Sequence, residues 1–409
     1  MAQTYKFGNG TWANKEGSTL AYNDEGNNYK PLPFSFERDS IATRVNKEGL
    51  IEVVGKDQPR IDYTDSAEGV LLLEPQSTNL ITYSEDFSQW IKKSQGTGSI
   101  PILTTNNSVS PNGNNNGTRL QCSLNGGNTS SDRSYIYLSG FNATPFDCTK
   151  SLYVKNNLQV EQVLFLGINQ IADRFTLSVS NDWQRIEILD EVLNSQFRVG
   201  VQGGGGNSDS IDIEIWGAML EANSFSTSYI PTSGSTVQRA AETANGSGNS
   251  EVFNDSEGVL FADVSSVNDG QYKFIGISDG TNSNRLGLFI GNSNNKMSVE
   301  SVGSGTNLGI YDKGINTENN NKIALKYKPN NCSLWVNGFE IGVDTSFAAF
   351  TNGTLTELSF YRGDNNFDFY GKTKEIGYYD TALTDLELET LTSYRSLNEL
   401  VTELNLNTL

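Results

Sequence analysis

The sequence predicts an all-β protein: two tandem jelly-roll β-sandwiches preceded by a short, irregular N-terminal leader. Its 409 residues are enough for two or three domains of about 150 residues each. The 40 glycines and the many asparagines and serines favour turns over helices. Apolar and polar residues also alternate with a period of two in short segments between turn-rich gaps, which is typical of sandwich strands.

Residues 1–70 form the predicted leader, which is too short to bury a large hydrophobic core of its own. Apolar and polar side chains alternate over residues 41–45, and residues 50–54 are again mainly apolar, with the turn sequence Asn46-Lys47-Glu48-Gly49 between them. This pattern predicts a β-hairpin. The leader either docks on another protein or packs back on the sandwich that follows, and the residues leave both possibilities open.

Residues 71–240 form the first predicted sandwich. Its candidate strands lie between clusters of glycine, asparagine and aspartate, and they cover residues 134–138, 151–154, 163–168, 183–189 and 197–201. The loop at residues 106–117 and the four glycines at 203–206 lack the strand-to-helix transition and the lysine of a phosphate-binding loop. We expect both to be loops at the ends of the sandwich.

A closing strand of this sandwich is predicted just before a polar run at residues 224–236. Three isoleucines alternate with three residues of the opposite face, in the order Ile211, Asp212, Ile213, Glu214, Ile215 and Trp216. The alternation indicates a strand with one apolar and one polar face. Trp216 falls on the polar face and is therefore expected to be exposed, unless a neighbouring domain covers it.

Residues 241–395 form the second predicted sandwich. Alternating side chains at residues 286–290 and 323–327 indicate strands. Asn337-Gly338 lies between two further strand-like segments and is well suited to a two-residue type I′ hairpin, because both positions of that turn need positive φ. The sequence therefore predicts a tight hairpin here.

The end of the chain has helical signals. Thr384 and Glu387 have the spacing of a capping box, which predicts a short helix after the second sandwich. In the C-terminal tail, residues 396–409, the side chains of Leu397, Leu400 and Leu404 fall on one helical face. Such a stripe docks on its own domain or contacts another copy of the chain.

Two groups of residues bracket the first sandwich. The first is Leu71-Leu72-Leu73-Glu74-Pro75-Gln76-Ser77-Thr78-Asn79-Leu80, followed by Tyr83-Ser84-Glu85-Asp86-Phe87 and Trp90. The second is Trp216-Gly217-Ala218-Met219-Leu220-Glu221, Ser228-Tyr229-Ile230-Pro231-Thr232 and Val237-Gln238-Arg239-Ala240-Ala241. Together they resemble the two ends of a carbohydrate-binding-type sandwich of tailed-bacteriophage virion proteins. The resemblance implies a virion component of tail-fibre or head-fibre type whose leader docks on other virion proteins.

The second sandwich also carries a resemblance. Its hairpin sequence Leu334-Trp335-Val336-Asn337-Gly338 is followed by strand-like segments at 355–361 and 373–379 and by the helical segment from Thr381. This order resembles the concanavalin A-like or laminin-G-like jelly roll.

The charge of the chain limits its partners. The formal net charge is −19 and the isoelectric point is about 4.5, so nucleic acids and anionic membranes are repelled. The first residues lack the apolar core of a signal sequence, and no run of about 18 apolar residues occurs. We expect no nucleic-acid partner, no membrane insertion, and assembly in a host cytoplasm.

The chain contains no histidine, which excludes imidazole-based catalytic triads and metal sites. Glycoside hydrolysis needs two opposed carboxylates. The nearest run to the pattern of concanavalin-like enzymes is Asp212-Ile213-Glu214, but the leading glutamate is replaced by Ser210. A strand with one wet face explains these carboxylates without catalysis. The sequence therefore predicts that the protein is not an enzyme.

Sugar binding agrees better with the composition, because 17 tyrosines, 5 tryptophans and many asparagines supply rings and amides. Trp216 is the predicted carbohydrate-binding residue. No cofactor is predicted, although Asp263 or Asp269 are candidate calcium ligands if their loops are not simply solvated. Cys122 and Cys148 pair only if their side chains face each other, and otherwise stay reduced.

The sequence therefore predicts a protein of the virion surface that displays lectin-like domains for adhesion to host-surface or environmental glycans. The resemblance implies a homo-oligomer, with a trimer favoured, and many weak contacts multiplied by copy number. Two alternatives stay open: a structural virion protein without a ligand, and a polysaccharide depolymerase.

Overall fold

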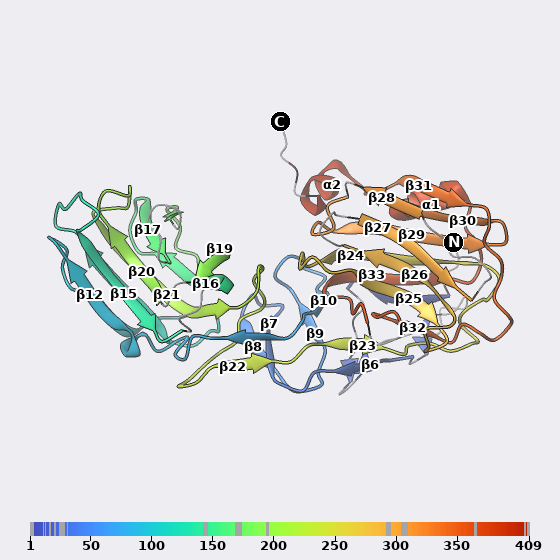
Figure 1. Cartoon of the computed structure of the whole chain (residues 1–409), viewed down its shortest axis with the longest axis horizontal. Helices are drawn as coiled ribbons and strands as arrows, with labels where there is room; N and C mark the ends of the chain where they lie inside the picture. The colour runs from blue at the N-terminus through green and yellow to red at the C-terminus, as the bar shows by residue number, and fades with distance from the viewer. Residues whose placement is uncertain are drawn as a thin grey trace. The chain divides into compact units, whose positions relative to one another are not determined.

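A computed structural model shows that the chain is nearly all β, as predicted, with two short α-helices among the described residues. It describes residues 4–10, 12, 14–15, 18–19, 22–23, 29–30, 32–141, 146–167, 174–193, 196–291, 296–303, 310–313, 315–363, 366–404 and 406. The described residues form two compact units, each with its own sheets (Figure 1). The middle unit comprises Ala42–Val53 and Gln76–Arg239, and the C-terminal unit comprises Met1–Ile41, Val54–Pro75 and Ala240–Leu409.

This division corrects the predicted domain boundaries. The prediction of a separate leader at residues 1–70 is wrong, because most of that segment belongs to the C-terminal unit and residues 42–53 belong to the middle unit. The two sandwiches are also not in simple tandem, since the middle unit is inserted into the C-terminal one along the sequence. The predicted boundary near residue 240 agrees with the structure.

The middle unit is a sandwich of two five-stranded antiparallel sheets. One sheet has the order β12 (Ile91–Gln95), β15 (Arg133–Ser139), β20 (Gln196–Gln202), β17 (Gln162–Leu166) and β18 (Arg174–Leu177). The other has the order β13 (Ile102–Ser108), β14 (Gly117–Ser123), β21 (Ser210–Glu221), β16 (Phe146–Asn156) and β19 (Gln184–Leu193). The five predicted strands of this sandwich, and its closing strand, are confirmed, although residue 168 of the predicted segment 163–168 lies outside the described residues.

The core of the middle unit follows from the alternation along these strands. Ile211, Ile213 and Ile215 of β21 are buried in one cluster with Leu120 of β14 and Val199 of β20. A short 3-10 helix, η1 (Phe87–Gln89), precedes β12. Beside the sandwich, β11 (Ser77–Asn79) pairs with β22 (Val237–Arg239), and β7 (Ala42–Val45) pairs with β8 (Ile51–Val54). The last pair is the predicted hairpin.

The C-terminal unit contains an eight-stranded and a five-stranded antiparallel sheet. The larger sheet has the order β31 (Phe339–Asp344), β30 (Asn331–Val336), β29 (Asn321–Lys328), β24 (Gly258–Ser266), β33 (Gly371–Tyr379), β10 (Val70–Leu73) and β9 (Arg60–Asp62), with β1 (Tyr5–Gly8) also paired to β33. The smaller has the order β28 (Ile310–Lys313), β27 (Lys296–Val302), β26 (Arg285–Ile290), β25 (Lys273–Ser278) and β32 (Glu357–Ser359). A core of aliphatic and aromatic side chains from both sheets lies between them.

Two smaller sheets complete the C-terminal unit. One has the order β2 (Asn14–Lys15), β3 (Ser18–Thr19), β6 (Phe34–Glu37) and β23 (Thr243–Asn245), and the other pairs β4 (Tyr22–Asn23) with β5 (Tyr29–Lys30). The predicted Asn337-Gly338 hairpin is confirmed between β30 and β31, and both residues have positive φ, 52° and 90°.

The strand β10 corrects the prediction that the middle sandwich opens at residue 71. Leu71 pairs with Thr373 and Leu73 with Gly371, both of β33 in the C-terminal unit. Every residue of Val70–Leu73 is buried. A run that is apolar on both faces needs cover on both faces, as in an inner strand of a sandwich. The middle unit therefore opens at Gln76, after the apolar run.

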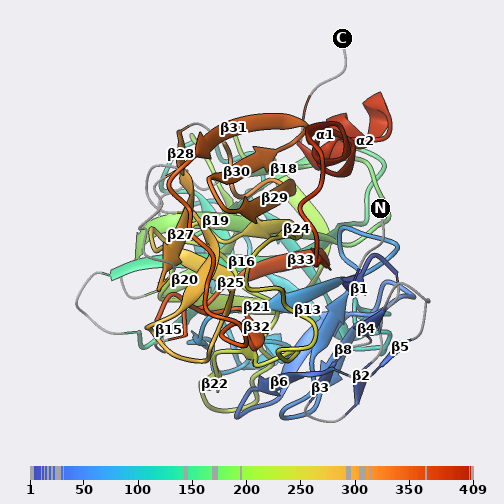
Figure 2. The same cartoon turned by 90° about the vertical axis from the view of Figure 1, so that its right-hand side faces the viewer.

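Two helices lie at one end of the larger sheet (Figure 2). Helix α1 (Asp385–Thr392) has the predicted capping box, and its Leu388 is buried against Val259 and Phe261 on the outer face of the sheet. Helix α2 (Leu397–Glu403) confirms the helical tail, yet Leu397 is 70% exposed. Leu400 and Leu404 are partly buried, and Glu399 and Glu403 of α2 form ion pairs with Lys322 and Lys374. None of the helices within the described ranges is long and apolar enough to cross a membrane.

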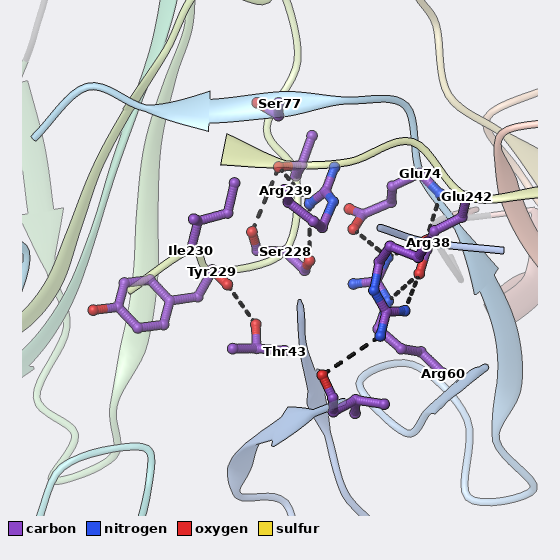
Figure 3. A network of polar contacts seen from close by, with 12 residues as sticks. Arg38, Thr43, Arg60, Glu74, Ser77, Ser228, Tyr229, Ile230, Arg239 and Glu242 are labelled. Atoms are coloured by element: carbon purple, nitrogen blue, oxygen red, sulfur yellow. Dashed lines mark hydrogen bonds and ion pairs between the residues drawn. The ribbon is translucent and has the colours of Figure 1, made fainter. Parts of the chain in front are cut away.

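A buried ion cluster ties together distant segments of the C-terminal unit (Figure 3). The Glu242 carboxylate accepts hydrogen bonds from Arg38 at 2.7 Å and from Arg60 at 2.8 Å. Arg60 also donates to Glu74 at 2.7 Å. The side chains of Arg38, Arg60 and Glu242 are fully buried, so two arginines and two glutamates neutralise one another away from water.

Candidate functional site

The outer face of the β13–β14–β21–β16–β19 sheet carries the residues that the sequence singled out. Asp212 and Glu214 point away from the isoleucine core, as the alternation predicts. The register places Glu214 opposite Arg119 of β14 and opposite Lys155 of β16. A row of charged side chains therefore crosses the middle of the sheet.

Hydrogen bonds fix the side chains of this row. Arg119 binds Asp212 with two nitrogens, and its Nε donates to Oδ1 at 2.8 Å. Gln121 donates to Asp212 Oδ2 at 2.9 Å, and Asn157 donates to Oδ1 at 3.1 Å. Burial by itself raises the pKa of Asp212, but the hydrogen bonds and charge of Arg119 outweigh burial and hold that pKa below its ordinary value. Asp212 is therefore an ionised, oriented acceptor.

Glu214 is the innermost group of the row, with only 2% of its surface exposed. Its Oε1 accepts from Asn107 Nδ2 at 2.6 Å and from Asn157 Nδ2 at 3.3 Å. Its Oε2 has no hydrogen-bond partner among the described residues. A buried carboxylate oxygen without a donor is costly, so Glu214 depends on the two asparagines for its side-chain hydrogen bonds.

An aromatic ring borders this row. The indole Nε1 of Trp183 donates to the carbonyl oxygen of Val109 at 2.9 Å, and the ammonium of Lys155 lies 5.4 Å from the ring centroid. The side chain of Trp183 is only partly buried. The hydrogen bond and the cation–π contact fix the orientation of the Trp183 ring beside the polar row. We call the set Arg119, Lys155, Asn157, Trp183, Asp212 and Glu214 the polar face.

The prediction that Trp216 is exposed is wrong, because its side chain is fully buried. Its ring packs on Tyr229 at a centroid distance of 4.6 Å and on Tyr153 at 5.5 Å. Ile51 of the β7–β8 hairpin and Met219 belong to the same cluster. Trp216 therefore presents no ring surface to a sugar.

The sequence contained two signals for this burial. The leader hairpin carries apolar residues on one side, and Tyr229-Ile230 interrupts an otherwise polar segment. Both supply the side chains that cover Trp216. Trp183 gave no distinct signal, because its position depends on Val109 and Lys155, which lie 74 and 28 residues away in the sequence.

The residues of the bacteriophage resemblance that lie between Gln76 and Arg239 have structural roles within the middle unit. The bracketing segments pair directly, with Ser77 opposite Arg239 and Asn79 opposite Val237. Asn79 Nδ2 donates to the carbonyl oxygens of Ala218 and Ile230, at 3.1 and 2.8 Å. These contacts join the first and last segments of residues 76–239.

The candidate calcium ligands lie apart from the polar face. Asp269 accepts from Lys273 Nζ at 2.5 Å, and Asp263 is buried in a hydrogen bond with Asn320. Among the described residues, no three acidic or cysteine side chains come together as a metal site. Cys122, Cys148 and Cys332 are buried thiols, and burial raises the pKa of Cys122 to about 12.

No protein-family model and no curated protein matches the chain. Solved structures similar to parts of it include a CBM40 module of the Ruminococcus gnavus IT-sialidase bound to α2,3-sialyllactose, with 17% identity over 36% of this chain and 94% of that one, and a TM-score of 0.31. Domain 4 of a Geobacillus stearothermophilus arabinanase in complex with arabinotriose has 16% sequence identity over 37% of this chain and 73% of that one, with a TM-score of 0.30. A Trypanosoma rangeli sialidase in complex with sialic acid has 12% sequence identity over 91% of this chain and 65% of that one, with a TM-score of 0.28. These low scores say nothing about the ligand of this chain.

Proposed function

We propose that the protein binds glycans without cleaving them, and that it does so on the polar face of the middle unit. The observation that carries the proposal is the hydrogen-bonded row around Glu214, bordered by the partly exposed side chain of Trp183. Sugars offer hydroxyls to carboxylates, amides and guanidinium groups, and C–H surfaces to aromatic rings. Both kinds of partner lie together on this sheet.

The fixed geometry of the polar face supports binding. Asp212 is held by Arg119, Gln121 and Asn157, so its orientation is set before a ligand arrives. Side chains that are already ordered lose little entropy on binding. We expect such a surface to bind weakly at a single site, and many copies multiply this weak binding.

Binding without turnover agrees with the state of Asp212. A glycosidase acid must hold its proton near neutral pH, which requires a raised pKa. The pKa of Asp212 is instead lowered, and Arg119 occupies its carboxylate. This supports a recognition role for Asp212.

We also propose that the protein is an adhesin of a tailed-phage virion, displayed on its surface as a homo-oligomer, with a trimer favoured, and assembled in the host cytoplasm. The support is the resemblance of residues 71–241 to phage fibre proteins. Residues 1–70 dock on other virion proteins in this proposal, although much of this segment also contributes strands to the C-terminal unit. Electron microscopy of particles labelled with an antibody to the chain tests the location.

The binding test uses the full chain and a panel of host-surface polysaccharides, followed by calorimetry. We expect dissociation constants from millimolar to micromolar, and at least a tenfold loss of affinity in Arg119→Gln and Trp183→Ala. Lys93→Gln, on an exposed strand of the opposite sheet, is the matched control and is expected to bind normally. Absence of binding to every glycan tested favours a purely structural protein.

The same samples test the depolymerase alternative. Incubation with a polysaccharide that binds should leave its viscosity unchanged. A falling viscosity that is lost in Asp212→Asn or Glu214→Gln would contradict the proposal of binding without turnover.

A further inference from the structure

The C-terminal unit contains a pocket that is separate from the polar face. Its volume is about 270 Å³, and it is lined by Ser35, Glu37, Thr243, Asn245, Tyr361 and Asp368. All six residues belong to the C-terminal unit. The size suits a single sugar ring or a molecule of similar bulk.

Strand register explains why polar side chains line this pocket. Strands β6 and β23 lie side by side (Figure 1). Their register places Thr243 opposite Glu37 and Asn245 opposite Ser35. The intervening residues, Phe36 and Ala244, point the other way and are buried in the core. Because strand side chains alternate, four polar side chains share the outer face of this two-strand ladder.

The remaining wall comes from the segment after β32. The amide of Phe360 donates to the carbonyl oxygen of Ala244 at 3.1 Å, which ties this segment to β23. The amide of Phe369 in turn donates to Phe360 at 2.7 Å. These two bonds place Tyr361 and Asp368, the immediate neighbours of the bonded residues, beside the ladder. Main-chain contacts to the core thus fix the wall.

The pocket has the charge of a site for a cation. Glu37 and Asp368 are its two charged lining residues, and neither lysine nor arginine lines it. Glu37 is exposed, whereas Asp368 is partly buried, and burial raises its pKa. A carboxylate in partial burial gains from a positively charged partner, because the partner offsets lost hydration.

The other lining groups are suited to hydroxyls. Ser35 and Thr243 each carry a hydroxyl that both donates and accepts, and Tyr361 adds a phenol ring. Asn245 adds an amide group to the lining, and its amide oxygen is buried without a hydrogen-bond partner among the described residues. Several hydrogen-bonding groups beside two carboxylates match a polyhydroxylated amine better than a simple metal ion.

We propose that this pocket binds an amine-bearing sugar, a hexosamine unit whose nitrogen is not acylated. The ammonium group pairs with Glu37 and Asp368, and the ring hydroxyls bond to Ser35, Thr243 and Asn245. Sugars with a carboxylate, phosphate or sulfate are repelled by the same two acids. The proposal goes beyond glycan binding on the polar face, because it assigns a second site and a different ligand class to the other unit.

The test titrates the full chain with glucosamine, N-acetylglucosamine, glucose and N-acetylneuraminic acid, followed by calorimetry and ligand-observed NMR. The titrations are run at about pH 6, where the amine is protonated. We expect glucosamine to bind at least tenfold more tightly than glucose or N-acetylglucosamine, and the anionic sugar not to bind. Equal binding of glucosamine and glucose would overturn the proposal.

Variants locate the site. Glu37→Gln and Asp368→Asn should each weaken glucosamine binding at least fivefold, and the double variant should abolish it. Glu37 is exposed, so its substitution keeps the test valid even if Asp368→Asn folds poorly. Glu251→Gln, an exposed acid of the same unit that does not line the pocket, is the matched control. Unchanged glucosamine binding in the double variant contradicts the assignment.

Two further measurements separate this site from others. Spermidine carries amines without a sugar ring, so tighter binding of spermidine than of glucosamine would refute recognition of a sugar. Arg119→Gln on the polar face should leave glucosamine binding unchanged, and Glu37→Gln should leave polysaccharide binding unchanged. Loss of both activities in either variant would contradict two independent sites.

Discussion

Glu242 shows how a single residue organises the buried charges of the C-terminal unit. Its carboxylate accepts hydrogen bonds from the side chains of Arg38 and Arg60, and its Oε2 also accepts a hydrogen bond from the backbone N–H of Glu74 at 2.9 Å. Removing one member of a buried ion cluster leaves the others desolvated and uncompensated. The cluster is therefore sensitive to any change at Glu242.

We predict that Glu242→Gln destabilises the C-terminal unit by about 3 to 5 kcal/mol, because it leaves two buried arginines short of one negative charge. Urea unfolding followed by circular dichroism measures the change. Glu52→Gln is the control, since its pair with Arg44 is partly exposed and contributes about 1 kcal/mol or less. Equal effects of the two substitutions would show that the buried cluster is not important for stability.

Asp263 makes the stability of the C-terminal unit depend on pH. Burial raises its pKa to about 7, and the nearby Lys374 and Lys322 offset this only in part, while Glu403 adds to it. An unfolded aspartate has a pKa of about 4, so the folded state binds this proton more tightly. Stability from this group is therefore fully present below about pH 4 and is lost as pH rises to about 7.

We predict that Asp263→Asn removes the pH-dependent loss of unfolding free energy that Asp263 causes. This loss is on the order of 4 kcal/mol between about pH 4 and 7. Unfolding free energies measured across this range should fall less steeply with pH in the variant than in the unchanged chain. Asp65→Asn, which removes a largely exposed aspartate of the same unit, serves as the control for the loss of one carboxylate. Parallel profiles for Asp263→Asn and the unchanged chain would refute the assignment.

At the scale of elements, local signals decide where α1 begins. Thr384 Oγ1 accepts from the backbone N–H of Glu387 at 3.4 Å, and the Glu387 carboxylate accepts from the backbone N–H of Thr384 at 2.9 Å. Two backbone donors that the helix leaves free are thereby satisfied. The start of α1 positions the buried Leu388 against the sheet.

We predict that Thr384→Ala costs about 1 kcal/mol, because the capping oxygen is lost. Amide hydrogen exchange in the first turn of α1 should become faster by about fivefold, in line with that energy. Thr390→Ala, at an exposed position inside the helix, is expected to change exchange little. Similar acceleration by both substitutions would argue against the cap.

The elements that the sequence predicted are those with local causes. The strands of the middle unit, the Asn337-Gly338 hairpin and the helix after Thr384 all follow from alternation, turn chemistry or capping. The assignment of Leu71–Leu73 to the middle sandwich failed, because its partner strand β33 lies about 300 residues later in the sequence. Burial of Trp216 was missed for the same reason, since Ile51 comes from a distant hairpin. The partners of Glu214 also come from other segments, so the polar face was not predictable as a set.

At the scale of the whole molecule, the two units differ in how they use the chain. The larger core cluster of the middle unit comes from residues between Ile81 and Leu220, and a smaller cluster adds Ile51, Tyr229 and Ile230. The core of the C-terminal unit instead needs Tyr5, Phe34 and Leu71 from the first part of the chain. The larger sheet also takes β1, β9 and β10 from there. The middle unit is therefore close to a continuous segment, whereas the C-terminal unit depends on both parts of the sequence.

We predict that a fragment of residues 76–239 folds by itself, because it retains both five-stranded sheets and their core. A fragment of residues 240–409 should not fold, because it loses the three N-terminal strands and their buried aromatic side chains. Circular dichroism and NMR dispersion distinguish the two outcomes. The first fragment also lacks Ile51, so Trp216 should become partly exposed and its fluorescence should shift to the red. A folded 240–409 fragment would mean that the N-terminal strands are accessory to the C-terminal sandwich.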